Sequence, residues 1–303
     1  MKSVIFFLML ALAAWADLVG DVRALNAKQD FAAGEKLVAD FRKTHGETPE
    51  MILALSWLGR GAQAAKQWDL AERYAQETRK LSLEALKKRK LDDEEKLPLA
   101  LGASIEVQGH TMAGRNQRTE AVLFLKEELK QWHDTSIRTR IQKNIHLLSL
   151  EGKPSPRIEV KEYLGEKPLP VAKLKGKPVI LFFWAHWCGD CKQQGPVLQQ
   201  LQKEYADKGL VVMGPTQRYG YMARGQDAGP EEELKYIEQV RQQYYGGIEG
   251  MACPVSEENF RSWGSSTTPT VVVVDRKGVV KLYHPGKMTY EELKPVVESV
   301  VGG

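Results

Sequence analysis

The sequence predicts an α+α/β chain, in which an irregular helical-hairpin domain precedes a fold with a central mixed sheet flanked by helices. Residues 17–152 carry apolar side chains at helical spacing throughout, whereas residues 158–303 alternate short apolar runs with amphipathic segments. Between them, residues 153–157 are punctuated by proline, as expected of a linker. The length of 303 residues is sufficient for two hydrophobic cores.

The first sixteen residues have the features of an export signal. Lys2 supplies a short positive start, residues 4–14 are apolar, and Ala14-Trp15-Ala16 fits the small-x-small cleavage rule. The apolar stretch is too short to cross a bilayer as a helix, which needs about 20 residues. We expect cleavage near Ala16, a periplasmic or secreted protein, and no stable membrane span. An uncleaved anchor is the alternative.

The first domain reads as about six or seven helices, because helix-breaking residues interrupt the pattern at intervals. Breaks occur at His45-Gly46, at Pro49 and around Gly114. One apolar helix face is formed by Ile52, Leu55, Leu58, Gly59, Ala62 and Ala65. Leu58-Gly59, with Ala71 further on, resembles the inner positions of a tetratricopeptide hairpin, although the repeat length is not constant. We expect a tetratricopeptide-like domain that can hold a protein partner.

The composition excludes some classes of function. Hydrophobic residues at 43% and charged residues at 27% are typical of soluble globular proteins. The formal net charge of +4 is small for this length. No segment combines a basic face with base-stacking aromatic residues, so the sequence predicts no nucleic-acid partner.

The second domain alternates strands and helices. The segment 178–185 is a continuous apolar run, typical of a buried central strand, and the turn at 275–278 joins two valine-rich runs as a hairpin. In chain order we expect a strand at 158–164, a strand at 178–185, a helix at 193–205, a strand at 210–213, a helix at 231–245, a hairpin of 271–274 with 279–283, and a helix at 291–300.

Two cysteines three positions apart follow the central strand. Cys188 lies where the next helix begins, so unpaired backbone N–H groups and the positive end of the helix dipole favour its thiolate. Cys191 lies one turn later, within reach of a disulfide with Cys188. The alternatives are a structural disulfide or a zinc half-site, but zinc needs about four ligands and Cys253 is the only other cysteine. We expect redox chemistry with no metal and no cofactor beyond this disulfide.

Two motifs in this domain resemble a known family. The run 176–191, GKPVILFFWAHWCGDC, resembles the active-site strand of TlpA-like extracytoplasmic thioredoxins. The segment Thr267-Thr268-Pro269-Thr270, ahead of a valine strand, resembles that family's cis-proline segment. The resemblance covers about residues 158–300. It implies a thioredoxin-like fold in which the cis-proline loop lies opposite the dithiol.

The resemblance also assigns roles to residues. It implies that Cys188 is the nucleophile and Cys191 the resolving thiol. The backbone of Thr268 would lie beside the dithiol, where an extended substrate can hydrogen-bond as an added strand. The expected substrate-binding residues are Trp187, Thr268 and Pro269.

The sequence departs from the family at positions that govern proton transfer. Phe182 occupies the place where many thioredoxins have a buried acid, and Gln194 stands where some members have a glutamate. The proton acceptor for Cys191 is therefore unassigned. Asp190 should oppose ionisation of Cys188, whereas a protonated His186 would favour it. We treat Asp190 and His186 as candidate modulators of the thiol pKa.

Two further features have competing interpretations. Cys253 is expected to be a small buried hydrophobic residue, with a reactive or mixed-disulfide role as the alternative. The segment 214–229 is longer than such a connection needs, so we expect a lid or a partner contact there.

These observations predict an exported thiol–disulfide oxidoreductase, more a reductant than an oxidant. Its partners would be protein thiols and disulfides, an unidentified electron donor, and a protein held by the helical domain. One alternative is a partner-binding adaptor whose redox domain is only structural. Another is a thiol-dependent peroxide reductase, which the missing threonine-plus-cysteine peroxidatic motif disfavours.

Overall fold

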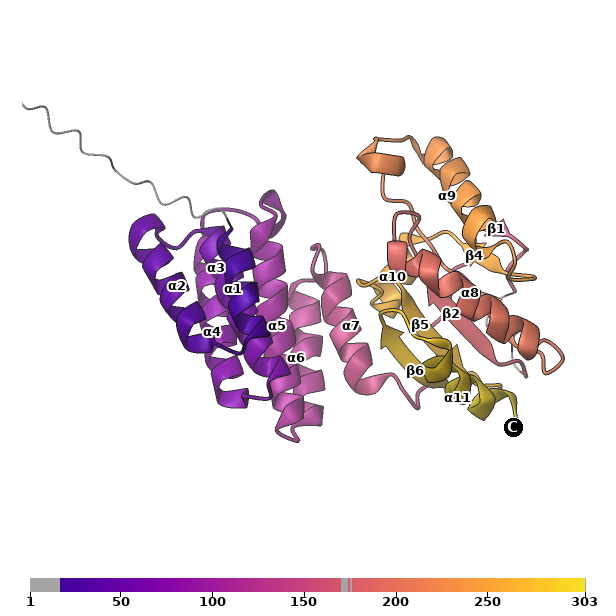
Figure 1. Ribbon diagram of the computed structural model, residues 1–303, viewed down its shortest axis with the longest axis horizontal. Helices are drawn as coiled ribbons and strands as arrows, with labels where there is room; N and C mark the ends of the chain where they lie inside the picture. Colours follow the sequence, from indigo (N-terminus) through magenta and orange to yellow (C-terminus); the bar gives the residue numbers. More distant parts are fainter. Residues whose placement is uncertain (1–16, 170–173, 175, 303) are drawn as a thin grey trace, which may run out of the picture. The chain divides into compact units, whose positions relative to one another are not determined.

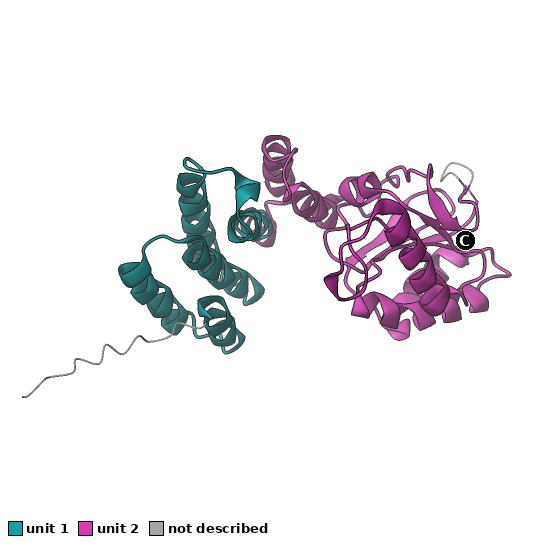
Figure 2. Ribbon diagram, turned by 90° about the horizontal axis from the view of Figure 1, so that it is seen from above, with its two compact units in different colours: residues 1–111 teal, residues 112–303 magenta. Residues whose placement is uncertain are grey.

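The computed structural model describes residues 17–169, 174 and 176–302 (Figure 1). The predicted export signal therefore lies outside the described residues. The chain divides into two compact units, one ending at Thr111 and the other running from Met112 to Gly303 (Figure 2). Helices make up the first unit and a mixed sheet with flanking helices dominates the second, which confirms the predicted fold class.

The first unit consists of helices, and side-chain caps fix the starts of the first three. Asp30 accepts a hydrogen bond from Ala33 N at 3.0 Å, and Thr48 accepts one from Met51 N at 3.2 Å. Proline at the first helical position adds to the start after Thr48. The elements are α1 (Leu18–Ala27), α2 (Phe31–His45), α3 (Pro49–Ala64), α4 (Trp68–Ala85), a 3₁₀ turn η1 (Leu91–Asp93) and α5 (Lys96–Gly114), which crosses into the second unit.

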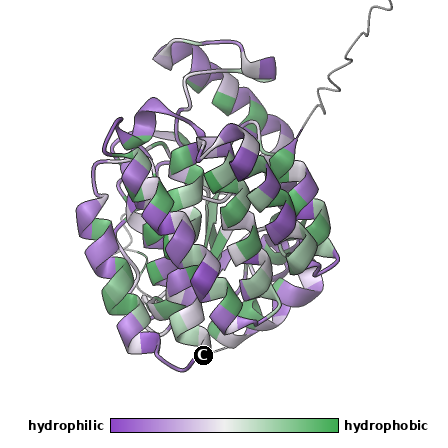
Figure 3. Ribbon diagram, turned by 90° about the vertical axis from the view of Figure 1, so that its left-hand side faces the viewer, coloured by the Kyte–Doolittle hydropathy of each residue, from purple (hydrophilic) through white to green (hydrophobic). Residues whose placement is uncertain are grey.

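Helices α3 and α4 approach closely at a glycine. A Cβ built on Gly59 would lie 3.5 Å from Tyr74 Cβ and 3.6 Å from Ala75 N, with Ala71 O at 3.8 Å. Small residues on both helices thus permit the contact, as the sequence predicts. Figure 3 shows hydrophobic and hydrophilic residues mixed along the helices that face the viewer, the pattern of helices with one packed face. Among the described residues, no helix has the length and apolar content needed to cross a membrane.

The second unit contains a six-stranded mixed sheet. The strands run in the order β1-β4-β3-β2-β5-β6, with β2–β3 and β3–β4 parallel and the other neighbours antiparallel. The elements are α6 (Arg118–Gln131), α7 (Arg138–Ser149), β1 (Tyr163–Gly165), β2 (Val179–Phe183), α8 (Gly189–Glu204), β3 (Val211–Met213), η3 (Ala223–Gly225), α9 (Pro230–Tyr245), β4 (Ala252–Pro254), α10 (Glu257–Trp263), β5 (Thr270–Val274), β6 (Val280–Pro285) and α11 (Tyr290–Val301).

Strand β2 is buried on both faces, as its unbroken apolar run predicts. Ile180 and Phe182 belong to a core that α8, α9 and α11 complete on one face of the sheet (Figure 1). Leu181 and Phe183 belong to a second core on the other face, together with side chains of α10. The residues that follow β2, which are Trp184, Ala185 and Cys188, continue the first of these cores.

The predicted strand at 158–164 is wrong for most of its length, because strand structure begins only at Tyr163. A side chain holds the preceding backbone instead. Asn259 Oδ1 accepts a hydrogen bond from Glu159 N at 2.7 Å, and Asn259 Nδ2 donates to Glu159 O at 2.8 Å. Asn259 lies on α10, a helix that the sequence analysis did not predict.

Helix α7 docks on the sheet domain through α10 and β6. His146 Nε2 lies 3.0 Å from Ser262 O, and its ring contacts Tyr283 edge-on at 5.5 Å. Gly264, in the left-handed region with φ 62°, ends α10, and a Cβ there would lie only 2.4 Å from Lys143 N. The α6–α7 hairpin is therefore a fixed part of the second unit.

Burial of His146 predicts a loss of stability on acidification. Burial lowers the pKa of His146 below its ordinary value of 6.5, and the hydrogen bond to Ser262 only partly opposes this. Below pH 6.5 the unfolded chain therefore binds more protons at this site than the folded chain. We expect the free energy of unfolding to fall as the pH drops from about 7.5 to about 5.5, with His146 contributing on the order of 1 kcal/mol.

Urea denaturation at the two pH values measures this effect. The matched variant is His146→Gln, which cannot titrate and should lose less stability on acidification than the wild type. Equal losses in the two proteins would show that His146 does not contribute.

Candidate active site

The two cysteines lie at the junction of β2 and α8. Cys188 is the N-cap of α8, and its Sγ accepts a hydrogen bond from Cys191 N at 3.0 Å. The two residues form a disulfide with their Cα atoms 5.2 Å apart, and both are buried. The first backbone N–H groups of a helix carry the positive end of its dipole. One of them points at the sulfur of Cys188, where it would stabilise a thiolate.

A lysine lies next to the charged residue between the cysteines. Lys287 Nζ is 3.0 Å from Asp190 Oδ1 and donates to Gln193 Oε1 at 2.7 Å. The cation offsets the negative field that Asp190 places near Cys188, although both side chains are about half exposed and water screens the pair. Sequence reasoning missed Lys287 because it comes from the segment between β6 and α11.

The structure brings the predicted substrate-binding residues together. The Thr268–Pro269 peptide bond is cis, as the sequence predicts. Trp187 is 47% exposed, and it lines a cavity of about 340 Å³ together with Thr268. An aromatic ring with an exposed face beside a buried dithiol offers a contact surface for a substrate. Their roles in binding remain predictions.

His186 makes a contact that the sequence does not reveal. Its side chain and that of Glu233, on α9, are both buried, with His186 Nε2 3.2 Å from Glu233 Oε1. A carboxylate only accepts hydrogen bonds, so His186 donates from Nε2. Glu233 also accepts from Tyr219 N at 2.6 Å and from Gly220 N at 2.9 Å. Glu233 therefore connects His186, which lies two residues before Cys188, to the segment 214–229.

Burial lowers the pKa of His186, and the hydrogen bond to Glu233 opposes this only in part. The ring is therefore neutral near neutral pH. Its edges contact three tyrosines, Tyr219, Tyr221 and Tyr236, at centroid distances of 5.6, 5.4 and 5.3 Å. The helix start supplies a positive field at Cys188 through the N–H of Cys191, and a modulating role of His186 on the thiol pKa stays a prediction.

The positions that depart from the family have structural partners. Phe182 packs edge-on against Tyr245 at 5.4 Å within the core. Gln194 Oε1 accepts a hydrogen bond from Met288 N at 2.7 Å, which fixes α8 to the segment before α11. Neither residue can accept a proton from Cys191.

The segment 214–229 is ordered by contacts at several points. The Arg218 guanidinium binds both oxygens of Glu162, at 2.7 and 2.6 Å, and its Nε donates to Pro230 O at 2.9 Å. Tyr221 and Asp227 form an isolated antiparallel bridge. Tyr219 contacts Trp187 edge-on at 5.5 Å, which places the segment beside the dithiol. Its function as a lid or partner contact stays a prediction.

Cys253 lies in β4 and is fully buried, as expected of a small hydrophobic residue. Burial raises the pKa of its thiol to about 12. A thiol in this state is a poor nucleophile. Among residues 17–169, 174 and 176–302, no group of three or more His, Cys, Asp or Glu side chains is placed to hold a metal ion.

We expect an alkylating reagent to modify the reduced native protein at Cys188 and to leave Cys253 unmodified. Peptide mass mapping after a short treatment at neutral pH measures both sites. In urea, where burial is lost, Cys253 should react as well. Alkylation of Cys253 in the folded protein at a rate similar to that of Cys188 would contradict its inert role.

Comparison with known families matches residues 166–300 to the thioredoxin-like domain. The thioredoxin-like protein YneN of Bacillus subtilis is 31% identical over 147 residues, which are 48% of this chain and 76% of that protein. The thiol:disulfide interchange protein DsbE of Xylella fastidiosa is 26% identical over 158 residues, 50% of this chain and 72% of the relative. The thiol-disulfide oxidoreductase ResA of Bacillus anthracis is 27% identical over 149 residues, 49% and 78% of the two chains.

The matched family region begins after the linker and contains both the Cys188–Cys191 disulfide and the cis Thr268–Pro269 bond. The helices that precede it fall outside this match. Relatives of the DsbE and ResA kind support an oxidoreductase enzyme. The chain therefore belongs to the thioredoxin-like family.

Proposed function

We propose that this chain is an exported thiol–disulfide oxidoreductase that reduces disulfides in extracytoplasmic proteins. The observation that carries the proposal is the hydrogen bond from Cys191 N to Cys188 Sγ at the start of α8. It aims a helix N-terminus at one sulfur of a disulfide-forming pair. The relatives named as thiol–disulfide interchange proteins and oxidoreductases support the same chemistry.

The reaction starts from the reduced pair. The Cys188 thiolate attacks one sulfur of a substrate disulfide, a Cys188–substrate bond forms, and the other substrate sulfur leaves as a thiolate. Cys191, as its thiolate, then attacks the sulfur of Cys188. The Cys188–Cys191 disulfide forms, and the second substrate sulfur leaves as a thiolate that takes up a proton. Two electrons pass from the pair to the substrate, and a dithiol donor restores them.

The polarity of the site supports the reductant direction. Oxidising members of this class are those whose reduced form is strongly stabilised. Here Asp190, between the cysteines, disfavours a thiolate at Cys188, and Lys287 offsets this only across a half-exposed pair. The neutral His186 adds no positive charge. Both features favour the disulfide form of the protein and so a low reduction potential.

The export and partner parts of the proposal rest on the sequence. Residues 1–16 have the pattern of a cleavable signal. The close approach of α3 and α4 at Gly59 is a feature of tetratricopeptide-like hairpins, and such domains bind partner proteins. In this proposal residues 17–152 recruit a partner, and residues 158–303 carry out the exchange without a metal or an added cofactor.

Measuring the reduction potential of the Cys188–Cys191 pair tests the proposal. The protein is equilibrated with thiol–disulfide buffers, and the fraction of free Cys188 is read by alkylation. A reductant is expected near about −270 mV, whereas an oxidant lies near about −120 mV. The low value should be accompanied by turnover of a protein disulfide in the presence of a thiol donor. A potential near the upper value would overturn the assigned direction.

A further inference from the structure

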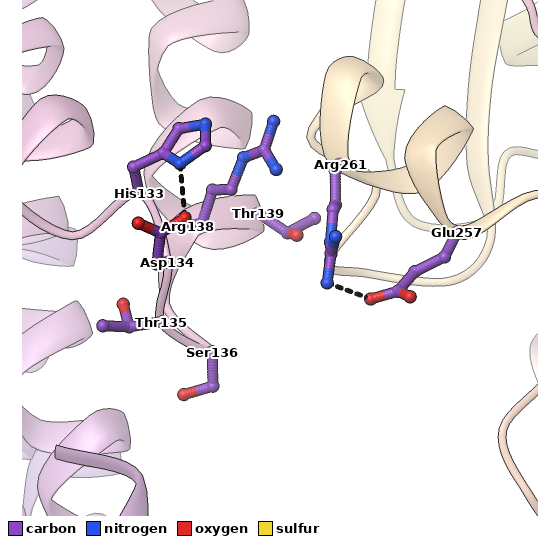
Figure 4. Close-up of a pocket in the computed structure, with 8 residues that line it drawn as sticks. All are labelled: His133, Asp134, Thr135, Ser136, Arg138, Thr139, Glu257 and Arg261. Atoms are coloured by element: carbon purple, nitrogen blue, oxygen red, sulfur yellow. Dashed lines mark hydrogen bonds and ion pairs between the residues drawn. The ribbon is translucent and has the colours of Figure 1, made fainter. Parts of the chain in front are cut away.

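A second cavity continues from the one beside the dithiol. The inner cavity, of about 340 Å³, contains Trp187 and Thr268. The outer cavity, of about 350 Å³, lies between the turn that leads into α7 and helix α10 (Figure 4). The two cavities share four lining residues, which are Ser136, Thr139, Glu257 and Arg261. They therefore form one continuous groove, which we call the α7–α10 groove.

Both walls of this groove are fixed to each other. His146, on α7, lies 3.0 Å from Ser262 O on α10, and Gly264 permits backbone approach to Lys143 at the end of α10. Figure 4 shows His133, Asp134 and their neighbours on one side, facing Arg261 and Glu257 on the other. The helical wall is thus a structural part of the approach to the dithiol.

The lining of the groove is rich in hydrogen-bonding groups and aromatic rings, and its charged side chains form pairs of opposite sign. Arg261 is paired with Glu257, and Arg138 lies 3.6 Å from Glu258. Because these pairs balance positive and negative charge, the groove has no excess charge that would attract a strongly ionic ligand. The hydroxyl side chains that line the inner cavity are Ser136, Thr139, Ser265, Ser266 and Thr268. Trp187, Tyr219 and Phe260 supply its aromatic faces.

Two buried polar atoms at the inner cavity lack a partner. Within the part of the chain that the structure describes, Ser265 Oγ and Gln217 Oε1 are buried and make no hydrogen bond. Both residues line the inner cavity. Ser265 is only 3% exposed, and buried polar groups of this kind are normally paired. A ligand with amide N–H and C=O groups would pair them once these two side chains rotate toward the cavity.

Resting on the function proposed above, we infer that the α7–α10 groove holds the extended polypeptide segment that flanks a disulfide of the substrate protein. Backbone amides match the hydroxyl and amide groups of the lining, and neutral or aromatic side chains match its rings. A small disulfide needs only the end of the groove at Trp187 and Thr268. The substrate class is therefore a protein, and the α6–α7 hairpin selects it.

The experiment compares two substrates in the full-length protein. One is oxidised glutathione, and the other is a disulfide-linked pair of peptides of about ten residues each, long enough when extended to span about 33 Å. Thr135→Trp, at a partly exposed position that lines the outer cavity but not the inner one, places a large ring in the groove. Ser299→Trp, at an exposed position on α11, is the matched control.

We expect Thr135→Trp to lower kcat/KM for the peptide disulfide about tenfold, the size of one well-placed interface contact. Its kcat/KM for oxidised glutathione should equal that of the wild type, and Ser299→Trp should leave both values unchanged. An unchanged peptide value, or an equal fall for both substrates, would overturn the groove assignment. A wild-type protein that reduces neither disulfide would instead overturn the proposed function itself.

Discussion

Replacing Cys188 with serine is expected to reduce disulfide turnover to the uncatalysed rate. The loss should reach at least about three orders of magnitude, because removing the nucleophile of a covalent mechanism leaves only binding effects. A hydroxyl at the N-cap of α8 keeps the hydrogen bond to the helix, so the fold should persist. The measurement is reduction of a protein disulfide with a thiol donor in excess, alongside a thermal unfolding curve.

The second cysteine gives a distinct outcome. Cys191→Ser should stop the reaction after the first step, so that a mixed disulfide between Cys188 and the substrate accumulates and is seen as a mass adduct. Cys253→Ala is the matched control and should turn over as the wild type does, since that thiol is buried away from the exchange. Residual turnover in Cys188→Ser that Cys253→Ala abolishes would reassign the nucleophile.

Glu233→Ala is expected to lower the free energy of unfolding by about 3 kcal/mol, because one buried and two partly buried donors lose their buried acceptor. Those donors are His186 Nε2, Tyr219 N and Gly220 N. The carboxylate is almost fully buried, at 1% exposure, so water cannot replace it without a local rearrangement. Urea denaturation of the oxidised protein measures the loss.

A neighbouring residue provides the control for this prediction. Glu232 is exposed on the same helix, and Glu232→Ala should change stability by no more than about 0.5 kcal/mol. Glu233→Gln retains the size of the side chain and one oxygen acceptor, so its loss should lie between the two alanine variants. Equal stabilities for Glu232→Ala and Glu233→Ala would show that the buried carboxylate is not an anchor.

The features predicted correctly from the sequence are those carried by local patterns. The apolar run around β2, the cysteine spacing and the Thr268–Pro269 dipeptide each act within a few neighbouring residues, so their structure can be read from the chain alone. Helix α10 was missed because it is short, Glu257–Trp263, and has no full amphipathic period. The segment 158–164 was mistaken for a strand because its alternation could not reveal that Asn259 takes its backbone hydrogen bonds.

The contacts that shape the site connect distant parts of the sequence. His186 meets Glu233, and Asp190 meets Lys287, through pairings that no periodicity or spacing encodes. The same holds for the α7–α10 groove, whose walls come from residues 133–139 and from helix α10, more than one hundred positions later in the chain. The cysteine pair could therefore be predicted from the sequence, whereas its neighbours Glu233 and Lys287 and the α7–α10 groove could not.

The docking of α7 has a consequence for how this protein can be divided or recombined. A chain shortened to residues 153 onward would contain the thioredoxin-like domain without helix α7. Ser262, Gly264 and Tyr283 would then lose the helix that covers them. A shortened chain that retains these contacts therefore begins near Met112, where the second compact unit starts. A shortened form of this chain that keeps the α7 contacts has to include the α6–α7 hairpin together with the sheet.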